Sequence, residues 1–61
     1  MWMKLTKVDG IPVLVNMNNV YGIHLSDDGG SVFVFSDGNT TVTVTESVDQ
    51  ITLMIRERQY V

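Results

Sequence analysis

One helix is predicted at residues 46–58, ESVDQITLMIRER, and every segment before it has the character of a strand or a turn. Ser47 and Gln50 have the spacing of a capping box, in which the serine hydroxyl accepts from a backbone N–H and the glutamine reaches back to the cap. At about 100° per residue one stripe of this helix is apolar, and its members are Val48, Ile51, Met54 and Ile55. The sequence therefore predicts a helix over residues 48–59 with one face against a core.

Leu53 falls on the opposite side of this helix. Tyr60, seven residues later, lies over the same line if the helix continues, because seven residues make about two turns. A second, thinner apolar seam is therefore expected on the outside of the helix. We expect this seam to contact a neighbouring molecule, and we expect Leu53→Asp to lower the assembly state without unfolding the chain.

The rest of the chain predicts five strands, at about residues 1–8, 11–15, 20–26, 31–36 and 40–45. Asp9 and Gly10 are typical of a tight hairpin with positive φ angles, and Pro12 is tolerated only in an edge strand or in the first residues of a strand. The asparagine-rich segment 16–19 has room for a single helical turn. The predicted fold is α+β and mainly β: a five-stranded antiparallel, strongly bent meander sheet or small open barrel, followed by one C-terminal helix, in a single domain of residues 1–61.

Two of these strands have patterns that bear on packing. In residues 20–26, Tyr21, Ile23 and Leu25 share one face, and Gly22 suggests a bulge or a close backbone approach. The run from Val32 to Phe35 has no polar face, so it is expected to be buried on both sides. One helix covers only one face of a small sheet, so the other face needs a barrel or a second subunit. The interface candidates are Leu53, Tyr60, Val32, Val34 and Trp2.

Length and composition also favour self-association. A chain of 61 residues buries only about 60% of its unfolded surface, and such small domains usually need a disulfide, a metal or a partner. The chain has no cysteine and one histidine, which leaves oligomerisation. Its net charge is −3 with four Lys and Arg residues, whereas nucleic-acid binders normally carry a basic patch. We therefore expect a homo-oligomer, with another protein as a further partner, and no nucleic acid.

No constellation of residues indicates catalysis or a cofactor. His24 stands between Ile23 and Leu25 without a nucleophile or carboxylate beside it in the sequence. Asp27, Asp28 and Asp37 would make a hard-cation site only if two loops met, and turn formation is the simpler interpretation. We predict no enzyme activity, no catalytic or metal-binding residue and no cofactor. The segment from Met1 to Leu5 is too short for an export signal or a membrane span, so a cytoplasmic protein without membrane insertion is expected.

Four local motifs, taken in their order along the chain, resemble the FlbD family of small flagellar and swarming-motility proteins. They lie at residues 4–10, 15–16, 37–38 and 44–51, and their most specific part is Glu46-Ser47-Val48-Asp49. The resemblance covers nearly the whole chain. It implies a small cytoplasmic bacterial accessory protein without catalytic residues. Prophage-borne small proteins with the same plan leave a phage origin open.

The leading functional hypothesis is thus a non-enzymatic, oligomeric interaction module. The alternative is an oligomeric small β-barrel that binds single-stranded nucleic acid. Its phosphate contacts would be Lys4, Lys7, Arg56 and Arg58, and its stacking rings would come from the aromatic residues of the sheet.

Overall fold

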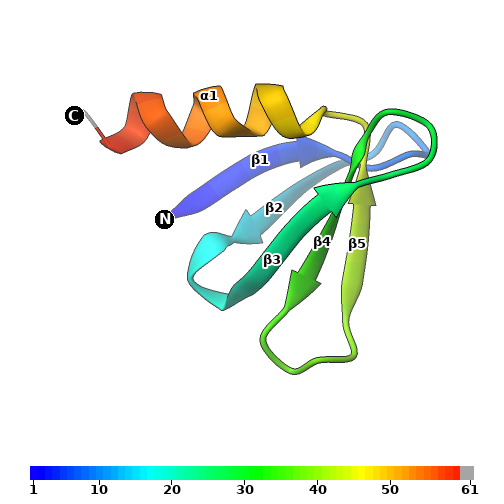
Figure 1. The fold of residues 1–61 in the computed structure, drawn as a ribbon, viewed down its shortest axis with the longest axis horizontal. Coiled ribbons are helices and arrows are strands. Elements are labelled where there is room, and N and C mark those ends of the chain that lie inside the picture. The colour runs from blue at the N-terminus through cyan, green and yellow to red at the C-terminus, as the bar shows by residue number, and fades with distance from the viewer. Residues whose placement is uncertain (60–61) are drawn as a thin grey trace.

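The computed structural model describes residues 1–59 and contains five strands and one helix (Figure 1). The elements in chain order are β1 (Trp2–Thr6), β2 (Pro12–Asn16), a 3-10 turn (Met17–Asn19), β3 (Val20–Leu25), β4 (Ser31–Phe35), β5 (Thr41–Val44) and α1 (Val48–Gln59). The five strands, the single helical turn and the C-terminal helix were all predicted from the sequence. Tyr60, one of the predicted interface residues, lies outside the described residues.

The mainly β class with antiparallel strands and a C-terminal helix is confirmed, but the strands form two separate sheets, so the prediction of one continuous five-stranded sheet is wrong, and the strands do not close into a barrel. β1 pairs with β2, and the other sheet has the order β3-β4-β5. The two sheets meet at a single bridge between Lys7 and Val44. The 3-10 turn explains the separation: Asn16 caps it by accepting from the Asn18 backbone N–H, and the turn carries the chain away from β2 before β3 begins, so β2 and β3 do not pair.

The first two hairpins are built in the same way, with three-residue loops. Lys7 N–H donates to Ile11 O and Gly10 N–H donates to Lys7 O, and the same pattern recurs from Ser26 to Gly30. This is a type I turn followed by a residue in the left-handed region. Gly10 takes that conformation with φ of 88°, and no residue other than glycine has a positive φ in the part of the chain described. The prediction of a hairpin at Asp9 is confirmed, but Asp9 itself does not adopt a positive φ.

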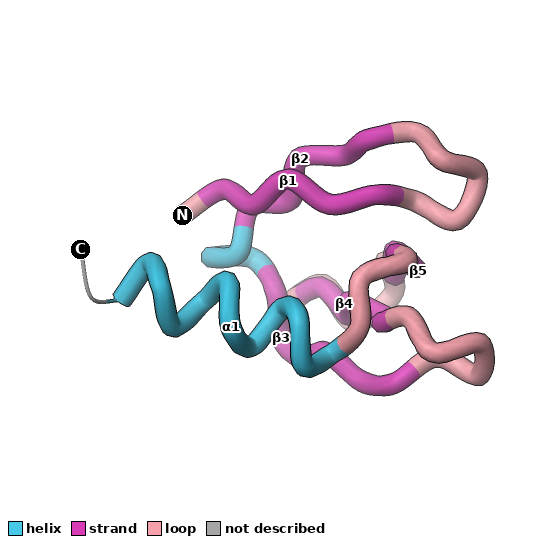
Figure 2. Tube along the Cα trace, turned by 90° about the horizontal axis from the view of Figure 1, so that it is seen from above, coloured by secondary structure: helices cyan, strands magenta, loops and turns pink. Residues whose placement is uncertain are grey.

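β3 is an edge strand whose regular pairing with β4 begins only after an irregularity. Gly22 is opposite Val34 and Ile23 is opposite Phe33, but the register shifts between Val20 and Gly22. Tyr21 is the extra residue of this bulge, which the glycine had suggested. In Figure 2, β3 lies under α1 on the side of the molecule away from the β1–β2 hairpin.

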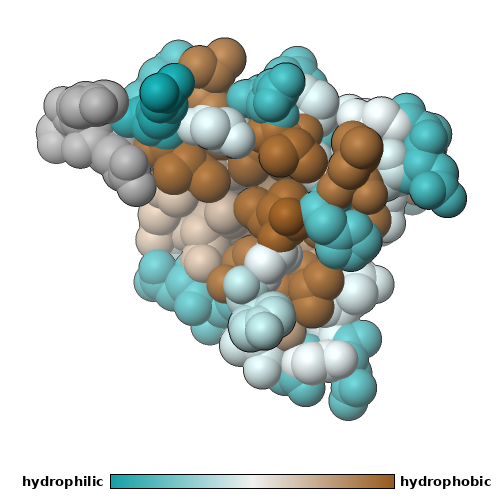
Figure 3. Space-filling view, in the orientation of Figure 1, coloured by the Kyte–Doolittle hydropathy of each residue, from teal (hydrophilic) through white to brown (hydrophobic). Residues whose placement is uncertain are grey.

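Helix α1 begins where the capping box predicted. Ser47 N–H donates to Gln50 Oε1 (2.8 Å) and Gln50 N–H donates to Ser47 Oγ (3.1 Å). Ile51 is buried, whereas Leu53 is 54% exposed, so the predicted apolar stripe and the outward position of Leu53 are both confirmed. The surface between α1 and β3 is strongly apolar (Figure 3).

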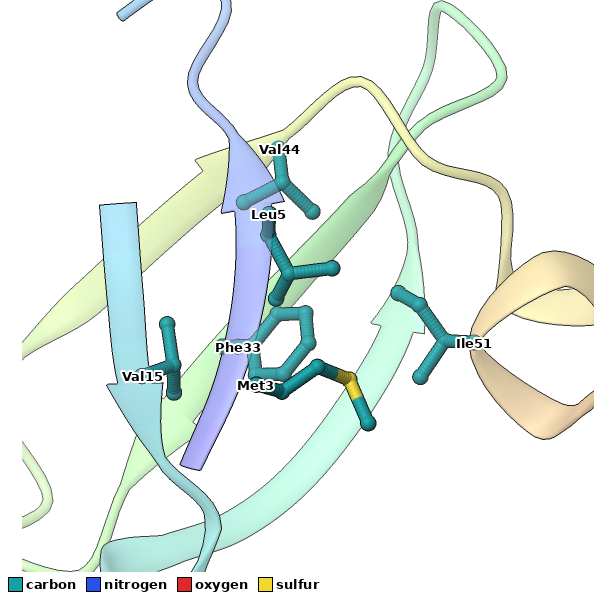
Figure 4. Close-up of a cluster of buried hydrophobic side chains, with 6 residues drawn as sticks. All are labelled: Met3, Leu5, Val15, Phe33, Val44 and Ile51. Atoms are coloured by element: carbon teal, nitrogen blue, oxygen red, sulfur yellow. The ribbon is translucent and has the colours of Figure 1, made fainter. Parts of the chain in front are cut away.

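The core lies between the two sheets and the helix. Its buried apolar residues come from every layer (Figure 4) and are Met3, Leu5, Val15, Phe33, Val44 and Ile51. Phe33 is the largest of them and is completely buried. Phe33 is opposite Ile23 of β3 and Val42 of β5. One face of the three-stranded sheet therefore packs against this core.

Candidate interaction surface

The junction of the two sheets is held by a set of residues that we call the Glu46 corner, namely Thr6, Gly30, Ser31, Thr45 and Glu46. Thr45 N–H donates to Thr6 O (2.8 Å), and Thr6 N–H donates to the Glu46 carboxylate (2.9 Å). The buried Ser31 hydroxyl donates to the Glu46 carbonyl (2.8 Å). Each bond joins segments distant in sequence, so the corner fixes how the sheets meet.

The carboxylate of Glu46 is ionised more readily than usual. Burial favours its protonated form, but the hydrogen bonds from Thr6 and Thr45 outweigh burial and hold the pKa of Glu46 below its ordinary value. No buried side-chain polar atom lacks a hydrogen-bond partner within the described residues. The hydrogen bonds of the Glu46 corner are therefore structural contacts between the two sheets.

Large apolar side chains are exposed in two separate places. The first is the outer side of the β1–β2 hairpin, which we call the hairpin face. It carries Trp2 and Leu14, 59% and 64% exposed, with Pro12 and Lys4 beside them in the register. Val8 and Ile11, in the loop of the same hairpin and next to it, are also exposed. The other faces of these strands are in the core, so the hairpin face is the uncovered side of a two-stranded sheet.

The second place is the outer edge of β3, which we call the β3 edge and which consists of Tyr21, Ile23 and Leu25. Tyr21 is 83% exposed and Leu25 67%, and Ile23 is half-buried. Beside this edge lies a depression between β3 and the start of α1, with Ile23, Leu25, Val48 and Asp49 among its lining residues. Apolar side chains of β3 therefore lie next to a depression.

The backbone of the β3 edge is also unpaired. The hydrogen bond from Ser26 N–H to Gly30 O fixes the phase of the β3–β4 ladder. Bonded positions alternate in an antiparallel pair, so Gly22 and His24 face β4, while Ile23 and Leu25 point their N–H and C=O groups outward. Within residues 1–59 no strand pairs with this side of β3.

The outer edge of β2 is blunted where the β3 edge is not. On β2, the hydrogen bond from Lys7 N–H to Ile11 O sets the phase, and it places Pro12 and Leu14 at the outward positions. Pro12 has no N–H to offer, which is a common protection against edge-to-edge pairing. β3 contains neither a proline nor a lysine, so its edge remains competent to pair.

The residues predicted as interface candidates are spread over different surfaces. Leu53 is exposed on the outer side of α1 and Trp2 belongs to the hairpin face. Val32 and Val34 are half-buried and lie on the face of β4 away from the core, opposite Thr43 and Thr41. The prediction that Tyr21 shares a face with Ile23 and Leu25 is wrong, because the bulge at Tyr21 shifts the alternation: Val20 and Ile23 both pack against the core, which leaves Tyr21 on the other face of β3. Sequence alternation also does not show that β3 is an edge strand.

The candidate polar chemistry does not assemble into a site. Asp27 and Asp28 lie in the β3–β4 loop, whereas Asp37 lies in the β4–β5 loop, where it accepts from Asn39 and Thr40. These loops are at opposite ends of β4, so the condition for a shared cation site fails. No group of three potential metal ligands exists among the described residues. His24 is exposed, and its ring nitrogen lies 3.3 Å from the Leu25 carbonyl.

The residues of the nucleic-acid alternative do not form one platform either. Phe33 is buried and Phe35 packs against the core, which removes both rings from a stacking surface. Lys7 is 3.9 Å from Asp9. The one helix in the described part of the chain is too short and too polar to cross a bilayer.

Comparison of the chain with protein families, with characterised proteins and with solved structures finds no match.

Proposed function

We propose that this protein is a non-enzymatic interaction module that works as a homo-oligomer. The observation that carries the proposal is the exposure of eight large apolar side chains among the residues that the structure describes, 1–59. Scattered apolar residues are normal on a protein surface, but contiguous patches mark interaction sites. Trp2 and Leu14 lie on the hairpin face, and Tyr21 and Leu25 lie on β3, whose outer edge is unpaired within the described residues.

The two surfaces suit different roles. Self-association through one of them stabilises a domain too small to bury much surface alone, and the other remains available for a different protein. The resemblance to the FlbD family supports an accessory role in motility. Its most specific motif includes Glu46 and Ser47, which hold the sheet junction and the helix start. A fold shared with that family would need both contacts.

Sedimentation equilibrium over micromolar concentrations tests the proposal. We expect a mass that rises from one to at least two chains as concentration increases, with a melting temperature that rises in parallel because assembly stabilises the folded state by mass action. A single monomeric species at every concentration up to about 0.1 mM, which is about 100 times a micromolar concentration, would overturn the proposal. Self-association weaker than this lies near the millimolar end of the affinity scale.

A further inference from the structure

We propose that the chain assembles head to tail, with the hairpin face of one copy packed on the uncovered face of the three-stranded sheet of the next copy. This uncovered face, which we call the outer sheet face, lies on the side of the sheet away from the core. The inference rests on the proposed self-association and names the two surfaces that produce it. The occupant of the hairpin face is thus a second copy of the same chain.

The outer sheet face is apolar at its centre. Val32 and Val34 alternate with the buried Phe33 along β4, so their side chains point away from the core, and both are half-buried. The bulge in β3 puts the exposed Tyr21 on the same side. A sheet face that is exposed to water normally carries polar side chains, so the two valines favour a covering layer. The register gives the residues of the outer sheet face as Gly22, His24, Val32, Val34, Thr41 and Thr43.

The two faces have complementary charge. Residues 1–16, which contain the hairpin, carry two lysines and one aspartate, a formal net charge of +1, whereas residues 17–61 carry two arginines and six acidic residues, a formal net charge of −4. Lys4 belongs to the hairpin face, opposite Leu14. Asp27 and Asp28 lie in the loop at one end of the outer sheet face, and Asp37 lies in the loop at the other end. The hairpin face of one copy is therefore attracted to the outer sheet face of another.

The same charges disfavour a symmetric contact of either face with itself. Two hairpin faces packed together would bring two copies of Lys4 into one interface, and two outer sheet faces would bring the acidic loops of both copies together. Like charges across an interface are costly. A head-to-tail contact avoids both costs. Because the core lies between the two sheets (Figure 2), each copy presents its two faces on different sides, and the contact repeats from copy to copy as a ring or a filament.

A depression at one end of the outer sheet face suits Trp2 of the next copy. Trp2 is 59% exposed and lies two residues from Lys4 on the same face, about 7 Å along β1. A buried indole N–H needs an acceptor, which the carboxylates of the depression supply, and the neighbouring lysine brings the opposite charge to them. The contact therefore places Trp2 in the depression and Lys4 at its acidic rim. The lining residues are His24, Leu25, Ser26, Asp27, Asp28 and Val32.

The two faces are similar in length, because β1, β2 and β4 have five residues each, about 17 Å. Sheets that pack face to face keep their strands within about 30° of each other, so the two strands of the hairpin cover β4 and one strand beside it. A contact of this size is at the low end of specific interfaces, where association is weak and reversible. We therefore expect a dissociation constant in the micromolar range.

Two charge variants, each of which disrupts one face, test the head-to-tail contact. Leu14→Asp places a carboxylate on the hairpin face, and Thr41→Arg places a cation on the outer sheet face. Both positions are exposed, so neither substitution opens the core. We expect each variant alone to associate at least about tenfold more weakly than the unchanged chain. In an equimolar mixture, the intact outer sheet face of the first variant meets the intact hairpin face of the second, and we expect a dimer with one copy of each.

Sedimentation of the two variants, separately and mixed, distinguishes the outcomes, and circular dichroism confirms that both chains are folded. Association in the mixture but in neither variant alone supports the head-to-tail contact. Undiminished association of either variant alone, or no association in the mixture, overturns it. The proposed function is judged separately by the unchanged chain: a chain that associates without this complementation refutes the present inference alone, whereas a monomeric unchanged chain refutes both.

Leu53→Asp is the matched control for Leu14→Asp, because it makes the same change at an exposed position on the outer side of α1. We expect it to leave association unchanged, and a loss equal to that of Leu14→Asp would place the interface on α1 and overturn the proposal.

Trp2 is the one tryptophan of the chain, so its fluorescence reports on its own surroundings. We expect the emission maximum of the unchanged chain to move to shorter wavelength as association proceeds, because the depression is less polar than water. An emission maximum that does not move while the mass rises would overturn the placement of Trp2.

Discussion

The Glu46 corner and the β3 edge are both places where a sheet ends, and they differ in how the backbone is satisfied. At the corner, the Glu46 carboxylate accepts from the Thr6 backbone N–H and the Ser31 hydroxyl donates to the Glu46 carbonyl. Thr45 N–H donates to Thr6 O across the junction of the two sheets. Along the β3 edge, Ile23 and Leu25 offer their backbone groups to solvent. The sheet ends at the corner are thus satisfied within the chain, whereas the β3 edge keeps backbone groups that a strand from another molecule can bond.

The contrast extends to the side chains. The corner is assembled from small and polar residues in close contact, and a Cβ atom at Gly30 would lie 2.2 Å from the Val44 carbonyl oxygen. The β3 edge carries Tyr21 and Leu25, which are among the most exposed large apolar side chains of the described residues. Substitutions at the corner should therefore change the stability of the fold, whereas substitutions at the edge should change assembly.

The largest effect is expected for Gly30→Ala. The new methyl group would meet the Val44 backbone, which is fixed in β5 and cannot rotate away. We expect a loss of about 3 kcal/mol or more in the free energy of unfolding, at the upper end of overpacking costs, measured by urea denaturation. Gly22→Ala is the control, because no atom lies within 4 Å of the Cβ position there and neither glycine has a positive φ. Equal losses in the two variants would show that contact at the corner is not the cause.

The next effect is expected for Glu46→Ala, which leaves the Thr6 N–H without its acceptor. We expect a loss of about 2 kcal/mol, as for other hydrogen bonds to a charged group. Glu46→Gln keeps an acceptor oxygen and removes only the charge, so we expect about half that loss at pH 7. Chemical denaturation of the three proteins at pH 7 gives both values.

The same carboxylate predicts a dependence on pH. Because the pKa of Glu46 is lowered in the folded chain, its ionised form stabilises the fold fully above the ordinary glutamate pKa, and this stabilisation is lost as the pH falls through the lowered folded value. The stability difference between the unchanged chain and Glu46→Gln should therefore shrink on acidification. Asp28 and Asp37, whose pKa values are also lowered, are present in both proteins and cancel. A difference that stays constant down to pH 2 would contradict this assignment.

The helix and its cap could be predicted because their signals are local. Ser47 and Gln50 are three residues apart, and the stripe that contains Ile51 repeats with the helical period, so the bounds 48–59 required no knowledge of the rest of the chain. The strands could likewise be predicted from the alternation of apolar and polar residues and from the glycine-containing turns. Local patterns thus gave the number, order and direction of the elements.

The division into two sheets could not be predicted, because it depends on contacts between distant residues. Thr6 and Glu46 are 40 residues apart, and neither one indicates by its neighbours that its side chain or backbone will reach the other. The exposure of Tyr21 has the same origin: its alternation with Ile23 predicted a shared face, but pairing with β4 introduces a bulge at Tyr21, and the strand order places β3 at the edge. Candidate surfaces are therefore harder to predict than helices and strands, because the exposure of a residue depends on which strands pair and which faces pack together.

The smallest effect is expected for Ser47→Ala, which removes one bond of the capping box and keeps the bond from Ser47 N–H to Gln50 Oε1. We expect a loss of about 1 kcal/mol, or a fall of about 4–8 °C in melting temperature for a domain of this size. Gln50→Ala removes the bond to Ser47 N–H instead and should lose a similar or smaller amount, and the double variant measures their coupling.

This variant also separates the two regions, because Ser47 follows Glu46 in the chain and borders the depression beside β3. Fraying of the first turn of α1 would loosen Val48, which is a wall of the depression, without touching the bond between Thr6 and Glu46. Hydrogen exchange should then accelerate at the Gln50 and Ile51 amides beyond the change in global stability, while the Thr6 amide follows global stability alone. Faster local exchange at Thr6 would show instead that the helix start and the corner are one cooperative unit, and that the cap supports the junction of the sheets as well as the edge.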